Sequence, residues 1–197
     1  MDHSYTFLDT SQNSVFLHIN HFGGISKYGH VYISDYSGTK FSLSLKHNIR
    51  SLDNQCDFEK IEGLEGIFIA NVIDSEYMKE AAEELDREIL ENEERMDEKK
   101  SKTGEEEDST RNFITTVITM NKGGNWQRIK APNRDMNGKT YDCGDYCFLN
   151  LHGMSGDYPP FYSVSSAVGI VLANGNVGKY LSNNQDEIST FLSRDGG

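Results

Sequence analysis

The sequence predicts an all-β fold, and three observations support this prediction. The chain contains 18 Gly but only 3 Pro, a composition that suits many tight turns. Tyr and Phe, at 10 residues each, lie with β-branched residues in short runs between the glycines. Three segments also share one turn pattern, which indicates a structural repeat.

The shared turn begins with a hydroxyl residue and has Asp or Asn at its second or third place. Gly stands at the fifth place and an aromatic residue at the eighth, where that place exists. Each copy follows a β-rich run, so we expect it to join two strands. The Asp or Asn accepts backbone hydrogen bonds, Gly takes a positive φ, and the aromatic ring covers the turn. The positions concerned are Ser34, Asp35, Gly38 and Phe41, then Thr119, Asn121, Gly123 and Trp126, and finally Ser193, Asp195 and Gly197.

The strands are predicted in order from hydrophobic periodicity. Alternation predicts a strand over 13–19, with Phe16 and His18 on one face, and a half-buried strand over 41–45. The run 67–73 is apolar on both faces and predicts a central, buried strand, which 167–175 mirrors. Residues 46–62 are predicted to be irregular, and 153–166 are rich in Gly, Ser and Pro. Further strands are expected at 31–34, 113–120, 126–130 and from 189 onward.

The repeat consists of a buried strand, a variable excursion and then strand, turn and strand. The fifth-place glycines are 85 and 74 residues apart, more than the roughly 40–50 residues of a propeller blade. The surplus lies in an acidic insertion and a cysteine-containing loop. Three repeats form an arc, whereas a propeller protects its sheets by radial closure. We therefore expect 1–197 to be about three blades of one larger β-propeller domain.

The insertion, 75–112, carries most of the negative charge. Of the chain's 31 acidic and 19 basic residues, 16 and 6 lie between Asp74 and Asp108, so the remainder is nearly neutral. One interpretation is an acidic, partner-binding helix or coiled-coil arm. The narrow apolar stripe favours the other, a solvated loop that is partly helical and otherwise disordered.

The net charge of −12 argues against nucleic acid or an anionic membrane surface as a partner. No apolar run reaches the roughly 18 residues of a membrane span, and the first residues lack signal-peptide character. We expect this segment to be soluble.

The sequence resembles the lumenal ten-bladed propeller of the sortilin family of sorting receptors, and its SorLA branch most of all. The resemblance runs from about Val15 to Gly197 in unbroken order, and its turns are of the Asp-box type. The long acidic insertion, and Tyr36 where an Asp is often found, depart from the family pattern. The matching segments are Tyr32–Lys46, Glu62–Ala70, Val117–Pro132, Ala167–Gly178, and the Cys143 and Cys147 pair before 149–152.

The resemblance implies a type I membrane receptor that binds propeptide, neuropeptide or protein cargo and carries it between Golgi, endosome and cell surface. This segment would lie on the lumenal or extracellular side. The membrane anchor and the sorting adaptors' binding site would lie outside it, and no cofactor is implied.

The resemblance also implies a ligand site and a disulfide. Tyr32, Ser34 and Phe68 match ligand-contacting positions of the family, although Leu43 stands where a ligand-binding arginine is expected. Core packing is the other interpretation of Tyr32 and Phe68. In an oxidising lumen, Cys143 and Cys147 would form a local disulfide, since their spacing is not that of a zinc knuckle. Cys56 would then be buried and unbridged, or paired outside the segment.

Two other classes of function are alternatives to a sorting receptor. A sialidase-like hydrolase needs an arginine cluster, but the arginines do not precede strands in a recurring way, so no catalytic residue is predicted. A soluble interaction propeller is the third possibility. No metal site is expected: His18, His21 and His30 lack companion ligands, and Asp135 to Gly138 is predicted to be a hairpin turn.

Overall fold

The computed structural model confirms the all-β fold. It describes residues 5–10, 13–21, 27–51, 55–79, 113–154 and 158–196. Its strands pair antiparallel throughout. The strands are β1 (Tyr5–Asp9), β2 (Phe16–Ile19), β3 (Tyr28–Ser34), β4 (Phe41–Ile49), β5 (Phe58–Lys60), β6 (Phe68–Ile73), β7 (Ile114–Thr119), β8 (Gln127–Lys130), β9 (Phe148–Leu151), β10 (Tyr162–Ser163), β11 (Val171–Gly178) and β12 (Ser189–Ser193).

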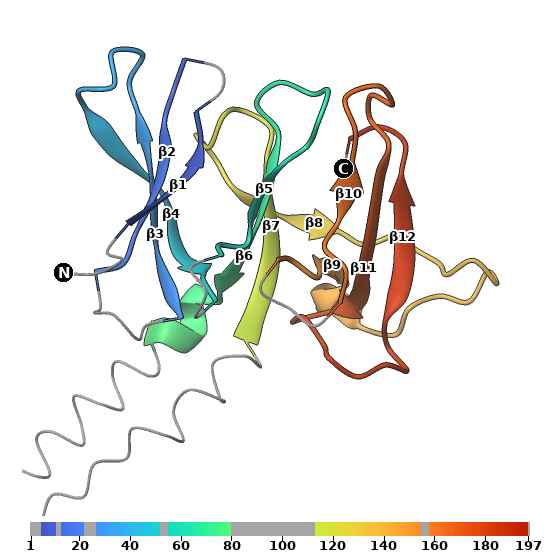
Figure 1. Cartoon of the computed structure of the whole chain (residues 1–197). Helices are drawn as coiled ribbons and strands as arrows, with labels where there is room; N and C mark the ends of the chain where they lie inside the picture. Colours follow the sequence, from blue (N-terminus) through green and yellow to red (C-terminus); the bar gives the residue numbers. More distant parts are fainter. Residues whose placement is uncertain are drawn as a thin grey trace, which may run out of the picture.

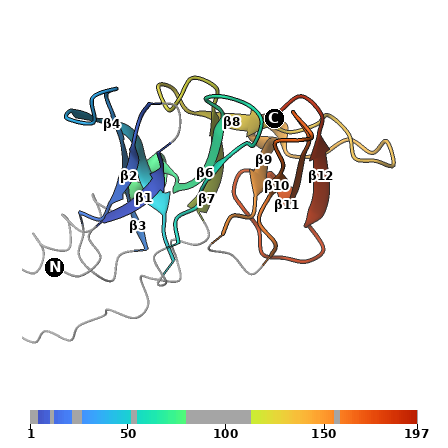
Figure 2. The same cartoon turned by 45° about the horizontal axis from the view of Figure 1, so that its top comes forward.

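The strands gather into three groups that stand side by side (Figures 1 and 2). We call them blade 1 (β1–β4), blade 2 (β5–β8) and blade 3 (β9–β12). Adjacent blades are also joined by hydrogen-bonded pairing, between Asn48 and Val72 and between β8 and β9. The fold is therefore the arc of about three propeller blades that the repeat predicts.

Two hydrophobic cores fill the spaces between the blades. The first includes Phe16 of blade 1 and Phe68 of blade 2, and the second includes Ile69 of blade 2 and Val171 of blade 3. All six residues of β6 are buried, because alternate side chains enter opposite cores. This confirms the prediction of a central strand that is apolar on both faces.

Strand register establishes which residues are equivalent in the three blades. Leu17 pairs with Tyr32, Ala70 with Val117, and Ala173 with Phe191, each at the same distance from the following turn. Each blade thus has a rear face, towards the preceding blade, and a forward face, towards the next. The rear-face rows are Phe7, Leu17 and Tyr32, then Phe58, Ala70 and Val117, then Ala173 and Phe191. The forward-face pairs are Phe16 and Ile33, then Ile69 and Ile118, then Leu172 and Leu192.

A polar pair also recurs at equivalent positions. The hydroxyl of Thr116 donates to Oδ1 of Asn71 over 2.7 Å, and that of Thr190 donates to Oδ1 of Asn174 over 2.8 Å. In blade 1 the Asn position is taken by His18, which is fully buried. No sequence signal pointed to this second element of the repeat.

The second and third turns share their internal bonding. The hydroxyl of Thr119 donates to Oδ1 of Asn121 (3.0 Å), and that of Ser193 donates to Oδ1 of Asp195 (2.8 Å). Gly123 has a φ of +79°. Gly197, expected at the equivalent place, lies outside the described residues. In the second turn Trp126 packs against the first core, as expected of the aromatic.

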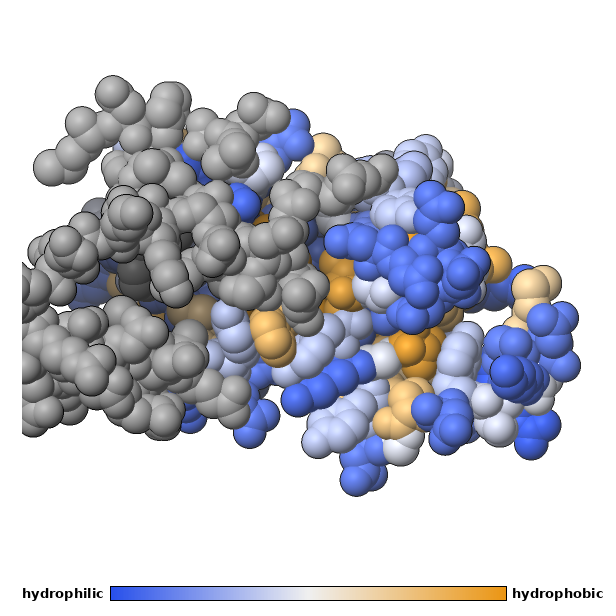
Figure 3. Space-filling view, turned by 90° about the horizontal axis from the view of Figure 1, so that it is seen from below, coloured by the Kyte–Doolittle hydropathy of each residue, from blue (hydrophilic) through white to orange (hydrophobic). Residues whose placement is uncertain are grey.

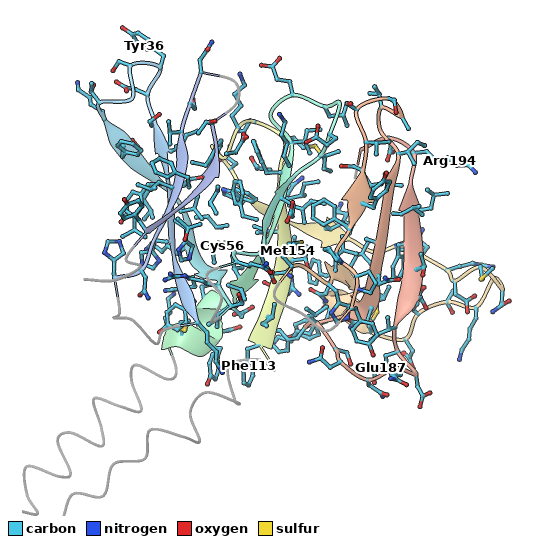
Figure 4. The ribbon with its side chains drawn as sticks, in the orientation of Figure 1. Tyr36, Cys56, Phe113, Met154, Glu187 and Arg194 are labelled. Carbon is cyan, nitrogen blue, oxygen red and sulfur yellow. A yellow bond between two sulfur atoms is a disulfide. The ribbon has the colours of Figure 1, made fainter. Side chains whose placement is uncertain are left out.

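The first turn is bonded differently because its acid stands one place earlier. Asp35 Oδ1 accepts hydrogen bonds from the backbone N–H groups of Thr39 (3.1 Å) and Lys40 (3.3 Å). Gly38 takes a φ of +70°. Phe41 does not cover the turn as expected but is 44% exposed, and Tyr36 points outward at the tip (Figure 4). Asp35 therefore accepts the backbone hydrogen bonds that an Asp at the place of Tyr36 would accept.

Several elements were not predicted. The structure adds β1, β5, β9 and β10, and β4 continues to Ile49, so 46–62 is not irregular throughout. These strands are short or rich in charged and polar residues, and their pairing partners, not their own periodicity, fix them. The loop after β8 is the expected hairpin turn, since Arg134 pairs with Thr140 and Asp135 Oδ1 accepts the N–H of Lys139 (2.8 Å).

The acidic insertion leaves the sheet between β6 and β7. Residues 75–79 form a helical turn, and 80–112, where the rest of the predicted helix or loop falls, lie outside the described residues. The two ends meet: the rings of Tyr77 and Phe113 stack at 3.9 Å, and the Asp74 N–H donates to the Phe113 carbonyl.

Within the described ranges, helices are too short and too polar to act as membrane spans. Seen from below, the described surface is largely hydrophilic, with small apolar areas between (Figure 3).

Candidate functional site

The structure does not bring Tyr32, Ser34 and Phe68 to one surface. Tyr32 lies half-buried on the rear face of blade 1, where its hydroxyl is 3.0 Å from Nε2 of His21. The Ser34 hydroxyl is buried, accepting from Val15 N–H and donating to the Asp35 carbonyl. Phe68 is fully buried, its ring 4.7 Å from that of Phe16.

Tyr32 and Phe68 are separated by the thickness of blade 1. Phe68 packs on Phe16, which is paired with Ile33 on the forward face of that blade, whereas Tyr32 lies on the opposite face. Val117, the equivalent of Tyr32 in blade 2, belongs to an inter-blade core. Ligand binding by these three residues stays a prediction, and the repeat supports the packing interpretation for Tyr32 and Phe68.

A different set of polar side chains converges in a small cleft between blades 2 and 3. Asp57 and Glu59 come from the start of blade 2, and His152 and Gly153 follow β9. Gly153 is required for this approach, because a Cβ there would lie 2.4 Å from Cγ of Asp57. The cleft holds about 10 Å³, room for roughly one water molecule. Met154, the next residue, lies between these blades and is 41% exposed (Figure 4).

Hydrogen bonds hold the floor of the cleft in place. Nδ2 of Asn71 donates to Oδ2 of Asp57 and to the Leu151 carbonyl, each over 3.0 Å. The Leu151 N–H donates to the Thr116 hydroxyl over 2.7 Å. Because Asp57, Asn71 and Thr116 are all buried, these bonds fix the position of blade 3 on blade 2.

Glu59 is the carboxylate at the mouth of this cleft. Glu59 pairs with Ile69 on the face of blade 2 that is turned towards blade 3. Its equivalent within blade 3 is Tyr162, which pairs with Leu172. Burial, and secondly the charge of Asp57, raise the pKa of Glu59 above its ordinary value. A partly buried carboxylate beside the apolar Phe161 and Ile69 suits a positively charged group that approaches it from outside, because the cleft itself has room for roughly one water molecule. No sequence pattern points to Glu59, because 46–62 shows no regular periodicity.

A larger groove, of about 320 Å³, lies beside β12 and is lined mainly by apolar residues of the second core, such as Ile129 and Phe191. In blades 1 and 2 the place beside the equivalent strand is filled by β4 and β8. The groove therefore lies at the place that the fourth strand occupies in blades 1 and 2.

The cysteines lie at two places. Cys143 and Cys147 form a disulfide around the 3₁₀ turn Gly144–Tyr146, with their Cα atoms 5.1 Å apart. Cys56 is buried between blades 1 and 2 and forms no disulfide with the other described cysteines. Burial raises the pKa of the Cys56 thiol to about 12, which makes it unreactive at neutral pH.

Among the residues that the structure describes, no group of His, Cys, Asp and Glu is arranged to hold a metal ion. The ring of His18 is enclosed, with Nε2 3.4 Å from the Asn48 carbonyl. His21 and His30 instead lie near each other on the rear face of blade 1, with ring centroids 5.3 Å apart and the rings tilted by 54°.

Blades that pack face to face in a repeated order, with turns of one design, define a β-propeller domain, here part of one. The family profile described as Sortilin-Vps10 (Sortilin, neurotensin receptor 3) matches residues 1–197. The chain therefore belongs to the sortilin–Vps10 family.

Curated relatives agree with this assignment. Proteins named vacuolar protein sorting/targeting protein 10 are 35% identical in Debaryomyces hansenii, 36% in Talaromyces stipitatus and 35% in Talaromyces marneffei. The alignments cover 98%, 98% and 100% of this chain but only 11%, 12% and 12% of those proteins. The chain thus spans about an eighth of the length of these relatives. The comparisons establish the family and do not place the chain in the SorLA branch.

Proposed function

We propose that this chain is part of the cargo-binding propeller of a protein-sorting receptor acting in Golgi, endosome and vacuole trafficking, on the lumenal side of the membrane. The family, and the names of relatives that sort or target vacuolar proteins, support the sorting role. The role is one of binding and not of catalysis.

The observation that carries the cargo-binding part is the cleft between blades 2 and 3. It places the Glu59 carboxylate beside apolar side chains, and the exposed Met154 directly follows Gly153 of the cleft in the chain. This combination suits an extended peptide segment that lies over the mouth of the cleft, with a Lys or Arg next to an apolar residue, since the cleft itself has room for roughly one water molecule. The basic group pairs with Glu59, while the apolar residue covers Met154.

The test is made in the full-length receptor with a peptide library presented on beads or in solution. Glu59→Gln keeps the shape of the side chain and removes its charge. We expect the affinity for peptides that carry an internal Lys or Arg to fall by about tenfold, the loss of one charge-assisted contact. Affinity for peptides without a basic residue should not change.

Glu62→Gln is the matched control, because Glu62 is exposed and lies three residues further along the chain. It should leave both affinities unchanged. Equal binding of basic peptides by the Glu59→Gln and unmodified receptors would remove the cleft from the proposal. The residues suggested by the resemblance form a second candidate site, and Tyr32→Ala tests it: a lower affinity would support that site.

A further inference from the structure

The chain contains two Asn-Gly pairs, Asn137–Gly138 and Asn174–Gly175. Asn is a thermally labile residue, and a Gly after it leaves the next backbone nitrogen open to approach, because Gly has no side chain. The first pair lies at the tip of the loop between β8 and β9, and the second lies inside β11. The same dipeptide is therefore present in two environments within one molecule.

The first pair is open to solvent. The loop between β8 and β9 extends away from the sheets (Figures 1 and 2). Asn137 and Gly138 are both exposed, and a Cβ on Gly138 would meet nothing within 4 Å. Within the described residues, the side-chain amide of Asn137 makes no hydrogen bond, whereas its backbone N–H does. The amide carbon of Asn137, Cγ, is therefore open to approach.

Asp135 holds this tip in a turn. Its Oδ1 accepts the N–H groups of Asn137 over 2.9 Å and of Lys139 over 2.8 Å. Its carbonyl accepts the N–H of Gly138 over 3.0 Å, so this bond must open before the Gly138 nitrogen turns towards the side chain of Asn137. Each of these bonds lies on a loop in contact with water and contributes little net stability, so the turn opens locally without unfolding the sheets.

The second pair is held by the sheet. The hydroxyl of Thr190 donates to Oδ1 of Asn174 over 2.8 Å, and the His152 N–H donates to the Asn174 carbonyl over 2.9 Å. Gly175 is packed so closely that a Cβ there would clash with the Asn150 carbonyl oxygen. The peptide between Asn174 and Gly175 therefore cannot rotate unless blade 3 opens.

We propose that Asn137 is a site of spontaneous deamidation in the folded protein, and that Asp135 sets the rate by holding the turn closed. The Gly138 nitrogen loses its proton to hydroxide and attacks Cγ of Asn137. The bond from Cγ to Nδ2 breaks, and Nδ2 takes a proton from water and leaves as ammonia. Water then opens the cyclic succinimide at either carbonyl, which leaves aspartate or isoaspartate at position 137.

The first turn shows the same bonding without the reactive amide. The Gly38 N–H donates to the Asp35 carbonyl over 3.1 Å, and the Thr39 N–H donates to Oδ1 of Asp35 over 3.1 Å. Ser37 stands at the place that Asn137 occupies in the loop. A Ser at this place is thus compatible with the turn, and it offers no amide carbon for attack.

Peptide mapping by mass spectrometry tests the proposal on the full-length receptor. The receptor is incubated at mildly alkaline pH in buffer and, in parallel, in urea. In urea both Asn137 and Asn174 should deamidate. In buffer Asn137 should still react, at least about tenfold faster than Asn174, because opening the β11 ladder adds a barrier that the loop lacks.

Three variants test the assigned roles. Asp135→Ala removes the two bonds to Oδ1 and should speed deamidation of Asn137 by about tenfold in buffer, with no change in urea. Asp142→Ala is the matched control, because it removes an exposed carboxylate of the same loop, and it should leave the rate unchanged. Asn137→Ser should give no deamidated peptide from this loop.

An Asn137 that stays intact in the folded receptor would overturn the proposal, and so would equal rates at Asn137 and Asn174 in buffer. An unchanged rate in Asp135→Ala would overturn the role of Asp135. Circular dichroism establishes that each variant is folded. The readout is the mass of a peptide, so these results do not depend on cargo binding.

Discussion

The hydroxyl of Thr116 donates to Oδ1 of Asn71 over 2.7 Å and accepts the N–H of Leu151 over 2.7 Å, so one side chain joins two blades. The same pair in blade 3, Thr190 and Asn174, contacts no further blade within the described residues, and Thr190 is exposed. One element of the repeat thus has two environments in a single molecule, which makes its contribution measurable.

We expect Thr116→Val to lower the free energy of unfolding by about 2–3 kcal/mol, because two buried polar partners lose their hydrogen bonds. Thr190→Val should cost less than about 1 kcal/mol, because water replaces the lost hydroxyl. Urea unfolding followed by circular dichroism measures both. Equal costs would show that burial between blades does not strengthen the pair.

Two turn glycines separate backbone strain from steric contact. Gly38 and Gly123 both have a positive φ, but a Cβ on Gly38 would meet nothing within 4 Å, whereas one on Gly123 would lie 2.5 Å from the Ser44 hydroxyl oxygen. Gly38→Ala should cost about 1 kcal/mol of stability, the strain alone. Gly123→Ala should cost about 2–4 kcal/mol, since overpacking is added. Unfolding curves that shift equally would contradict the steric argument.

Stability should fall as the pH drops from 6.5 towards 4. Burial lowers the pKa of His18 from 6.5 to about 4, so the unfolded chain binds its proton more tightly than the folded chain. The stabilisation is complete above pH 6.5 and is lost progressively below it, by up to about 3 kcal/mol.

His18→Asn introduces the residue found at this place in blades 2 and 3, and it should flatten the decline between pH 6.5 and 4. Thermal unfolding at a series of pH values measures the effect. A decline of the same size in the variant would assign the pH dependence to other groups, among them His30 and His47, whose pKa values burial also lowers.

The cysteines should differ in reactivity. In unfolded, unreduced protein only the Cys56 thiol should react with a maleimide, and all three thiols should react after reduction. In folded protein Cys56 should react far more slowly, because the thiol is buried and its pKa is raised. Three reactive thiols before reduction would exclude the disulfide.

Replacing Cys143 and Cys147 with Ser should lower the free energy of unfolding by about 2 kcal/mol or less, since the loop that the disulfide closes is short.

Local sequence patterns were sufficient for the strands that carry the fold. The apolar run at 67–73 and the turns at Gly38 and Gly123 predict β6 and its neighbours, since alternation and turn chemistry depend only on nearby residues. The strands β1, β5, β9 and β10 were missed because pairing to β2, β6 and β11 holds them in place.

The sequence by itself determined the class of fold, the repeat and the family resemblance, because these follow from short-range periodicity and from residues at fixed spacing. Only the tertiary structure decided which faces meet. It separated Tyr32 from Phe68 by a sheet, brought Glu59 and His152 together from positions 93 residues apart, and left Phe7 and Leu172 exposed. The physical reason is that burial depends on the neighbouring blade, which no local pattern specifies.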